Sequence, residues 1–213
     1  MPRRRPRLFR LLVTLLVLVV IAAGAAAAVV TANITSRPDY PDAITFGDAA
    51  GSEAARSGGT PTAEDGYIAD GDSLSLSDGS APAVARLDPA LRSALQDALA
   101  AAEEDGIELR IGSGWRSKAY QAWLLRDAVT TYGSEQEAAR WVGTPTTSQH
   151  VRGEAADISP YDAADWLNRK GAQFGLCRTY DNEAWHFELS PSAVVAGCPP
   201  MFRDPTEDPR MRG

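Results

Sequence analysis

Residues 11–30 form a run of twenty residues without a charged side chain, LLVTLLVLVVIAAGAAAAVV. As an α-helix, such a run is long enough to cross the roughly 30 Å apolar core of a bilayer. Five arginines precede the run and no basic residue follows until Arg37, a bias that predicts a cytoplasmic amino terminus. We therefore expect a basic cytoplasmic tail at 1–10, a transmembrane anchor at 11–30 and the rest of the chain outside. The alternative is a cleaved signal peptide, since the alanine-rich end of the run offers small-residue cleavage sites.

The chain beyond this run is acidic. The whole sequence has 21 Lys and Arg residues and 28 Asp and Glu residues. The five arginines of residues 1–10 leave 16 basic residues against the 28 acids, a net charge of −12 after residue 30. Phosphate backbones bind to basic surfaces, so this charge argues against nucleic acid as a partner. The hydrophobic content of 44% is that of a globular chain.

The sequence contains two cysteines, Cys177 and Cys198. Both interpretations of the amino terminus place them outside the cytosol, where disulfides form and persist. We therefore predict that they form a disulfide. Two free thiols or two metal ligands are the alternative.

The composition divides the rest of the chain. Residues 31–83 are rich in Gly, Ser, Asp, Ala and Pro and have no regular apolar period, which predicts a flexible extracytoplasmic linker. Its end contains two short apolar groups, at 67–69 and 74–76, that could dock on a folded domain. We expect that domain at 84–200 and a tail at 201–213.

Periodicity within the domain predicts both helices and strands. Asp88 can cap a helix that Pro89 opens, and apolar residues then recur at helical spacing from Leu91 to Ala102. Residues 107–111 alternate apolar and polar side chains, as a half-buried strand does. The expected helices are 88–105, 117–129, 134–142 and 160–170, and the expected strands are 107–111, 155–158 and 185–189. These elements predict an α+β fold, in which helices group around a small, mainly antiparallel sheet.

The two histidines of the sequence, His150 and His186, each lie in a dense polar pattern. The first pattern runs from Ser148 to Asp157 and the second is Glu183-Ala-Trp-His186. Together they supply two imidazoles and one carboxylate, a ligand set for a metal ion, and leave Glu183 as a base. Strand alternation places His186 and Glu188 on one face and Trp185 and Phe187 on the other. Each residue alone has an ordinary structural explanation, but their joint occurrence favours a metal site.

The patterns Ser-x-His-x-x-Gly-x-Ala-x-Asp and Glu-x-Trp-His resemble the signature of VanY-type D-alanyl-D-alanine carboxypeptidases. That family belongs to a larger group with lysostaphin-like peptidases and the hedgehog domain. The resemblance covers roughly 87–189, including the segment Ser113-Gly-Trp-Arg-Ser117. It implies a Zn²⁺ site in a cleft on the sheet. The implied ligands are His150, Asp157 and His186, the implied base is Glu183, and Arg116, Ser148 and Gln121 are implied to contact substrate or the developing oxyanion.

Several roles remain open at this stage. Arg116 can bind the oxyanion or a terminal carboxylate, or it can form an ion pair with one of the many acids. Trp115 and Trp185 can line the cleft for substrate or belong to the core. Trp115 also stands where the family usually has tyrosine, and the stretch from Asp157 to Glu183 is short, so the preference for a particular stem peptide does not transfer.

The sequence thus predicts a monomeric zinc D-alanyl-D-alanine carboxypeptidase, anchored on the outer face of a bacterial cytoplasmic membrane or secreted, that hydrolyses peptidoglycan stem peptides. An L,D-carboxypeptidase or endopeptidase of the same fold is one alternative. A non-catalytic peptidoglycan-binding domain is another, although no ligand or base is missing. A non-haem iron oxygenase is disfavoured, because its carboxylate usually follows the first histidine by two residues and Asp157 follows His150 by seven.

Overall fold

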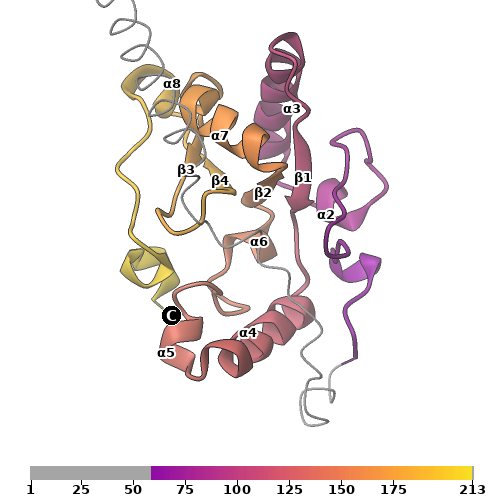
Figure 1. The fold of residues 1–213 in the computed structure, drawn as a ribbon, viewed down its shortest axis with the longest axis vertical. Helices are drawn as coiled ribbons and strands as arrows, with labels where there is room; N and C mark the ends of the chain where they lie inside the picture. Colours follow the sequence, from indigo (N-terminus) through magenta and orange to yellow (C-terminus); the bar gives the residue numbers. More distant parts are fainter. Residues whose placement is uncertain (1–58, 213) are drawn as a thin grey trace, which may run out of the picture. The chain divides into compact units, whose positions relative to one another are not determined.

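A computed structural model describes residues 59–212 (Figure 1). Its centre is a four-stranded antiparallel sheet in the order β1-β2-β4-β3. The strands are β1 (Arg110–Ser113), β2 (Ala155–Ser159), β3 (Leu176–Arg178) and β4 (His186–Leu189). Helices group around this sheet instead of alternating regularly with its strands, so the predicted α+β class is confirmed.

Two helices, α3 (Pro89–Glu104) and α7 (Tyr161–Lys170), build the apolar core with the sheet. The predicted cap of α3 is present, since the Asp88 carboxylate accepts hydrogen bonds from the backbone of Ala90 and Leu91 at 2.8 and 3.1 Å. The helices contact each other and strands β2, β3 and β4. The core side chains of β2 and β4 are Ala156, Ile158 and Phe187, all buried.

The opposite face of the same strands is polar. Asp157 pairs directly with His186 in the β2–β4 register, and Glu188 follows two residues later on the same face. His186 and Glu188 are nevertheless buried, at 4% and 8% exposure. Side-chain alternation in β2 and β4 therefore gives a core face, with Ala156, Ile158 and Phe187, and a site face, with Asp157, His186 and Glu188. The side chains of both faces are largely shielded from solvent.

Three further helices lie in the lower half of Figure 1: α4 (Lys118–Tyr132), α5 (Glu135–Ala138) and the one-turn α6 (Gln149–Arg152). Ser117 and Ser134 cap α4 and α5 by accepting from backbone N–H groups. Helix α6 ends at Gly153, whose φ of +76° lies in the left-handed region. A Cβ atom at this position would collide with the carbonyl oxygen of Arg86. The turn that leads from α6 into β2 therefore requires glycine.

The remaining elements are short. Within residues 59–212 they are α2 (Pro82–Ala85), α8 (Ala193–Ala196) and the 3₁₀ helices η2 (Ala63–Asp65), η3 (Gly171–Phe174), η4 (Pro205–Glu207) and η5 (Pro209–Met211). Cys177 of β3 and Cys198 after α8 form a disulfide in the structure, as the sequence predicted.

The described end of the predicted linker packs on the domain. Leu74 and Ile111 exchange two backbone hydrogen bonds of 2.9 Å, so residue 74 extends the sheet beside β1. Leu76 is buried at 3% exposure. Ser117 is bonded to Asp65 through both its backbone N–H and its hydroxyl, each at 2.8 Å. Residues 59–83 thus pack on the domain, so the flexible linker predicted at 31–83 does not extend over them. The apolar groups at 67–69 and 74–76 had left such docking open.

The predicted anchor at 11–30 lies outside the described residues. Within 59–212, no helix has both the length and the apolar character needed to cross a bilayer.

Three predicted elements differ in extent. The helix expected at 117–129 is α4, which continues to Tyr132. The strand expected at 107–111 begins at Arg110 and continues to Ser113, because Ile107 donates its backbone N–H to Ala102 O at 2.9 Å and so completes the end of α3. The helix expected at 134–142 ends at Ala138 and continues only as turns.

Candidate metal centre

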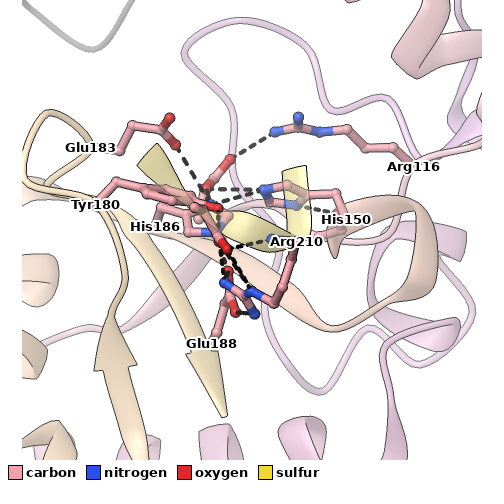
Figure 2. A network of polar contacts seen from close by, with 10 residues as sticks. Arg116, His150, Tyr180, Glu183, His186, Glu188 and Arg210 are labelled. Atoms are coloured by element: carbon pink, nitrogen blue, oxygen red, sulfur yellow. Dashed lines mark hydrogen bonds and ion pairs between the residues drawn. The ribbon is translucent and has the colours of Figure 1, made fainter. Parts of the chain in front are cut away.

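Two histidines and one aspartate bring three ligand atoms together on the site face; Figure 2 shows the two imidazole rings. His150 Nε2 lies 3.2 Å from His186 Nδ1 and 3.4 Å from Asp157 Oδ1. His186 Nδ1 lies 3.3 Å from the same Asp157 oxygen, which closes a ligand triangle of nearly equal sides. Ligand atoms bonded to a tetrahedral zinc ion at about 2.0–2.1 Å would lie about 3.3 Å apart. The ligand triangle therefore fits one such ion.

The fold explains why residues so far apart in sequence meet. Asp157 and His186 are cross-strand partners in the β2–β4 ladder, so their side chains emerge side by side. His150 comes from α6, and the turn at Gly153 brings that helix back over the start of β2. The two sequence patterns thus meet through one strand pairing and one glycine turn.

Each imidazole is oriented through its second nitrogen. His150 Nδ1 lies 2.8 Å from the carbonyl oxygen of Gly114, which can only accept, so Nδ1 carries the proton and the Nε2 lone pair faces the triangle. His186 Nε2 lies 3.2 Å from Glu188 Oε1, so its Nδ1 faces the triangle. Histidines that bind metal ions usually donate their other N–H to a carbonyl or carboxylate in this way.

The electrostatics of the ligand triangle favour a positive charge. Burial would raise the pKa of Asp157, but the neighbouring His150, His186 and Arg116 hold it well below its usual range. Burial opposes a charge on His186, yet hydrogen bonds to Asp157 and Glu188 raise its pKa to about 10. The pKa of His150 is lowered, first by burial and then by the charge of Arg116. A metal cation bound here would take the place of the proton on His186.

Glu183 precedes β4 and lies beside the ligand triangle, with Oε2 3.6 Å from His186 Nδ1 (Figure 2). The residue is buried at 7% exposure, and its Oε1 has no hydrogen-bond partner within residues 59–212. Burial raises the pKa of this carboxyl to about 7, while His186 works against that shift. A buried carboxylate with a free oxygen and a pKa near neutrality is suited to exchange a proton with a reacting group.

Arg116 lies next to the ligand triangle rather than apart from it. Its guanidinium donates to Asp157 Oδ2 at 2.8 Å and to Ser113 Oγ at 2.9 Å. Gln121, buried at 1% exposure, accepts from Arg116 at 3.4 Å and donates to the carbonyl of Gly143 at 2.8 Å. The ion pair that the sequence left open therefore exists, with an expected metal ligand as the partner. Gln121 uses both ends of its amide to hold the arginine and the loop after Val142.

The other predicted contact residues surround this centre. Ser148 is buried at 3% exposure and begins α6 without a side-chain capping bond. Trp115 is partly exposed, and the Arg86 guanidinium lies 4.3 Å from the centroid of its ring. Trp185 is partly exposed directly before His186. Their roles in substrate binding remain predictions.

Four polar residues of the site were not predicted as functional. Strand alternation had predicted that Glu188 lies on the same face as His186. It did not indicate a function for Glu188. Arg210 pairs with Glu188 (Figure 2). Asp208 pairs with Arg210 and with the hydroxyl of Tyr180. Arg210 and Asp208 belong to the predicted tail, where no periodicity or motif marks them.

Comparisons with known proteins agree with this site. The family model VanY, described as D-alanyl-D-alanine carboxypeptidase, matches residues 84–191, slightly more than half of the chain. A D-alanyl-D-alanine carboxypeptidase of Enterococcus faecalis is 29% identical over 127 residues. The aligned part is 48% of this chain and 47% of that protein, so the chain spans about half the length of this curated relative.

Solved structures of similar proteins include two of VanY enzymes. VanYB in complex with D-alanine-D-alanine has 27% sequence identity and a TM-score of 0.49, covering 52% of this chain and 74% of that one. A mutant of the VanB-type vancomycin resistance D,D-pentapeptidase VanY in complex with Zn(II) has 26% identity and a TM-score of 0.48, covering 52% and 75%. The LD-carboxypeptidase LdcB has 24% identity and a TM-score of 0.46, covering 52% and 63%.

The extent of the family match decides the assignment, because residues 84–191 include every residue of the ligand triangle together with Glu183 and Arg116. It confirms the resemblance that the two sequence patterns predicted. The chain belongs to the VanY family of D-alanyl-D-alanine carboxypeptidases.

Proposed function

We propose that this protein is a zinc-dependent D-alanyl-D-alanine carboxypeptidase that hydrolyses peptidoglycan stem peptides outside the cytoplasmic membrane. One observation carries the proposal: a ligand triangle of His150, Asp157 and His186 with the dimensions of a tetrahedral site, and the buried Glu183 beside it. Membership of the VanY family supplies the class of bond and substrate. The anchor at residues 11–30 and a monomeric state are parts of the same proposal.

A zinc ion held by the ligand triangle would polarise the scissile carbonyl and lower the pKa of a bound water. Glu183 would accept a proton at Oε1, which has no hydrogen-bond partner within residues 59–212, and return it to the leaving amine. Burial raises the pKa of this carboxyl, which favours its taking up a proton during the reaction.

Arg116 supplies a fixed positive charge at the edge of the ligand triangle. Ser113 and Gln121 hold its guanidinium before any substrate arrives, so little reorganisation is needed when negative charge develops nearby. Its planar donor group suits either the oxyanion of hydrolysis or the terminal carboxylate of a D-alanine substrate. The second role would select peptides at their carboxyl end, as a carboxypeptidase requires.

The decisive experiment is mass analysis of purified muropeptides after incubation with the full-length protein and zinc. Loss of one D-alanine from pentapeptides is the expected result. Conversion of tetrapeptides to tripeptides, with pentapeptides untouched, would assign the L,D activity instead. Opening of cross-linked dimers would indicate an endopeptidase.

A catalytically inactive binding domain is the remaining outcome. It would be indicated by retention of muropeptides on immobilised protein with no release from any of them, in the presence of stoichiometric zinc. If release is observed, the Glu183→Gln variant is the matched control, and its rate should be at least about 100-fold lower than that of the parent.

A further inference from the structure

The C-terminal segment, residues 201–212, lies beyond the family match and was predicted to be a plain tail. In the structure it returns to the site face and buries polar side chains there. Asp204 and Asp208 are exposed by only 2% and 0%. Buried carboxylates require partners, so the contacts of this segment are specific interactions rather than a loose covering.

Arg210 of this segment connects it to the ligand triangle. Its guanidinium binds both carboxylate oxygens of Glu188, at 2.6 Å to Oε2 and 3.2 Å to Oε1. The same Oε1 lies 3.2 Å from Nε2 of His186. A bidentate arginine fixes both the position and the plane of a carboxylate. Arg210 therefore fixes the group that orients the His186 ring.

A second connection runs through Asp208. Its carboxylate accepts from Arg210 at 2.6 Å and from the hydroxyl of Tyr180 at 2.9 Å. The Tyr180 ring in turn packs on the His186 ring, with the centroids 5.1 Å apart. The contacts form a closed circuit that starts and ends at His186 and passes through Glu188, Arg210, Asp208 and Tyr180. Figure 2 shows the side chains of His186, Glu188, Arg210 and Tyr180 in this circuit.

The C-terminal segment is itself held at several points. Phe202 donates its backbone N–H to Thr179 at 3.0 Å and accepts from Asp181 at 2.8 Å, so residue 202 pairs beside Tyr180. Arg140 donates to Asp204 at 3.1 Å. Near the end of the segment, the side chain of Met211 contacts Gly143. These contacts bring Arg210 to Glu188 in one defined orientation.

We propose that the C-terminal segment is part of the metal centre, with Arg210 and Asp208 as positioning residues that act through Glu188 and Tyr180 on His186. Glu188 holds the Nε2 side of the ring, and Tyr180 holds its face. Together they keep Nδ1 directed at the ligand triangle. This inference rests on the metal site of the proposed function, but it does not depend on which peptide bond is cut.

The test compares Arg210→Ala with Arg203→Ala in the full-length protein. Arg203 lies in the same segment, but its side chain is 71% exposed and pairs with Glu207 at 2.7 Å and, more distantly, with Asp204 at 3.9 Å. Neither partner belongs to the circuit, so its loss makes the same charge change without removing a circuit contact. Zinc affinity is measured by competition with a chelator, and the ligand field by the visible spectrum of the cobalt-substituted protein. Loss of an outer partner of a metal ligand typically weakens binding about 10- to 100-fold. We expect that loss and an altered cobalt spectrum for Arg210→Ala, and parental values for Arg203→Ala.

Two milder variants keep the test decisive if Arg210→Ala does not fold. Arg210→Lys retains the charge but loses the bidentate geometry, and Glu188→Gln keeps the size of the outer partner but removes its charge. Both should fold with a native circular dichroism spectrum and still bind zinc more weakly. Because both act on one circuit, combining them should weaken binding less than the product of the two single effects.

The outcomes separate the two levels of inference. If the parent protein binds no zinc, the proposed function fails. If the parent binds zinc and the folded Arg210 and Glu188 variants bind it equally tightly with unchanged cobalt spectra, the positioning role is refuted while the proposed function stands.

Discussion

The two faces of strands β2 and β4 are built from alternating residues of the same short segments, yet they have opposite characters. On one face, Ile158 and Phe187 pack on α3 and α7 in a core of apolar side chains. On the other face, Asp157, His186 and Glu188 are also largely buried, but charged and neutral polar groups surround them. The core face requires only volume and shape, whereas the site face requires particular atoms at particular distances. A change on the core face should therefore alter stability, and a change on the site face should alter chemistry.

The largest expected effect is the loss of metal from His186→Ala. This change removes one of three ligand atoms, so zinc affinity should fall by more than the 10- to 100-fold typical of an outer partner. Elemental analysis of protein purified without chelator should give near-stoichiometric zinc for the parent and almost none for the variant. Full zinc occupancy of the variant would remove His186 from the site.

The neighbouring residue provides the opposite test. Phe187 is 0% exposed on the core face, and Phe187→Ala should lower the free energy of unfolding by about 3–5 kcal/mol. The matched control is Val195→Ala, at 94% exposure, which should change stability by no more than about 0.5 kcal/mol. Urea unfolding measures both. If Phe187→Ala were as stable as the parent but bound no metal, the division between the two faces would be wrong.

Glu183→Gln should affect the reaction without affecting either face of the sheet. The change keeps the size of the side chain and removes its ability to accept a proton, so D-alanine release should slow by about 10²–10⁴-fold, equivalent to about 3–5 kcal/mol of barrier. Zinc content should remain parental. Glu154→Gln, the same change at an exposed position, should leave the rate unaltered. Equal rates for Glu183→Gln and the parent would show that this carboxylate carries no proton in the reaction.

The smallest expected effect is the contribution of Asp208 to stability, which should depend on pH. Burial would raise the pKa of Asp208, but hydrogen bonds from Arg210 and Tyr180 hold it below its usual range. A carboxyl whose pKa falls on folding stabilises the protein above its unfolded pKa of about 3.9, and this contribution disappears as the pH falls through the folded value. We expect Asp208→Asn to cost about 1–3 kcal/mol at pH 7 and markedly less at pH 3.

Urea unfolding at pH 7, 5 and 3 measures this dependence. Asp97→Asn, on the exposed side of α3, is the matched control and should show no comparable loss at pH 7. The cost of Phe187→Ala should be the same at all three values, because no charge is involved. A cost for Asp208→Asn that did not change with pH would mean that the carboxyl keeps its proton in the folded state.

Local signals in the sequence were sufficient for much of the fold. The cap at Asp88 and the helical spacing after it placed α3 within one residue at each end. Strand β3 was missed, because its three residues, Leu176 to Arg178, are too few to show a period and are extended by their pairing with β4. Helix α6 was missed for the same reason, since a single turn between Gln149 and Arg152 has no apolar stripe.

Within the site, too, the contacts set by local motifs could be predicted, whereas the contacts set by the tertiary fold could not. The meeting of His150, Asp157 and His186 followed from two motifs and strand alternation, which are properties of short segments. The pairing of Arg210 with Glu188 joins residues 22 positions apart, and the intervening chain carries no signal for its return. The partner of Arg116 could not be predicted either, because an arginine beside many acids has several possible carboxylates and only the tertiary fold selects Asp157.

Gly153, in the motif of this family, meets two different structural requirements. The glycine turns the chain between two expected metal ligands, and its carbonyl also accepts the backbone N–H of Asp88, the residue that caps α3. Because any side chain would collide with Arg86, replacing the glycine would disturb the start of α3 as well as the ligands. A relative that had lost catalysis could exchange its histidines and its glutamate freely but would still need this glycine. We therefore expect related sequences that have lost the histidines to retain the glycine.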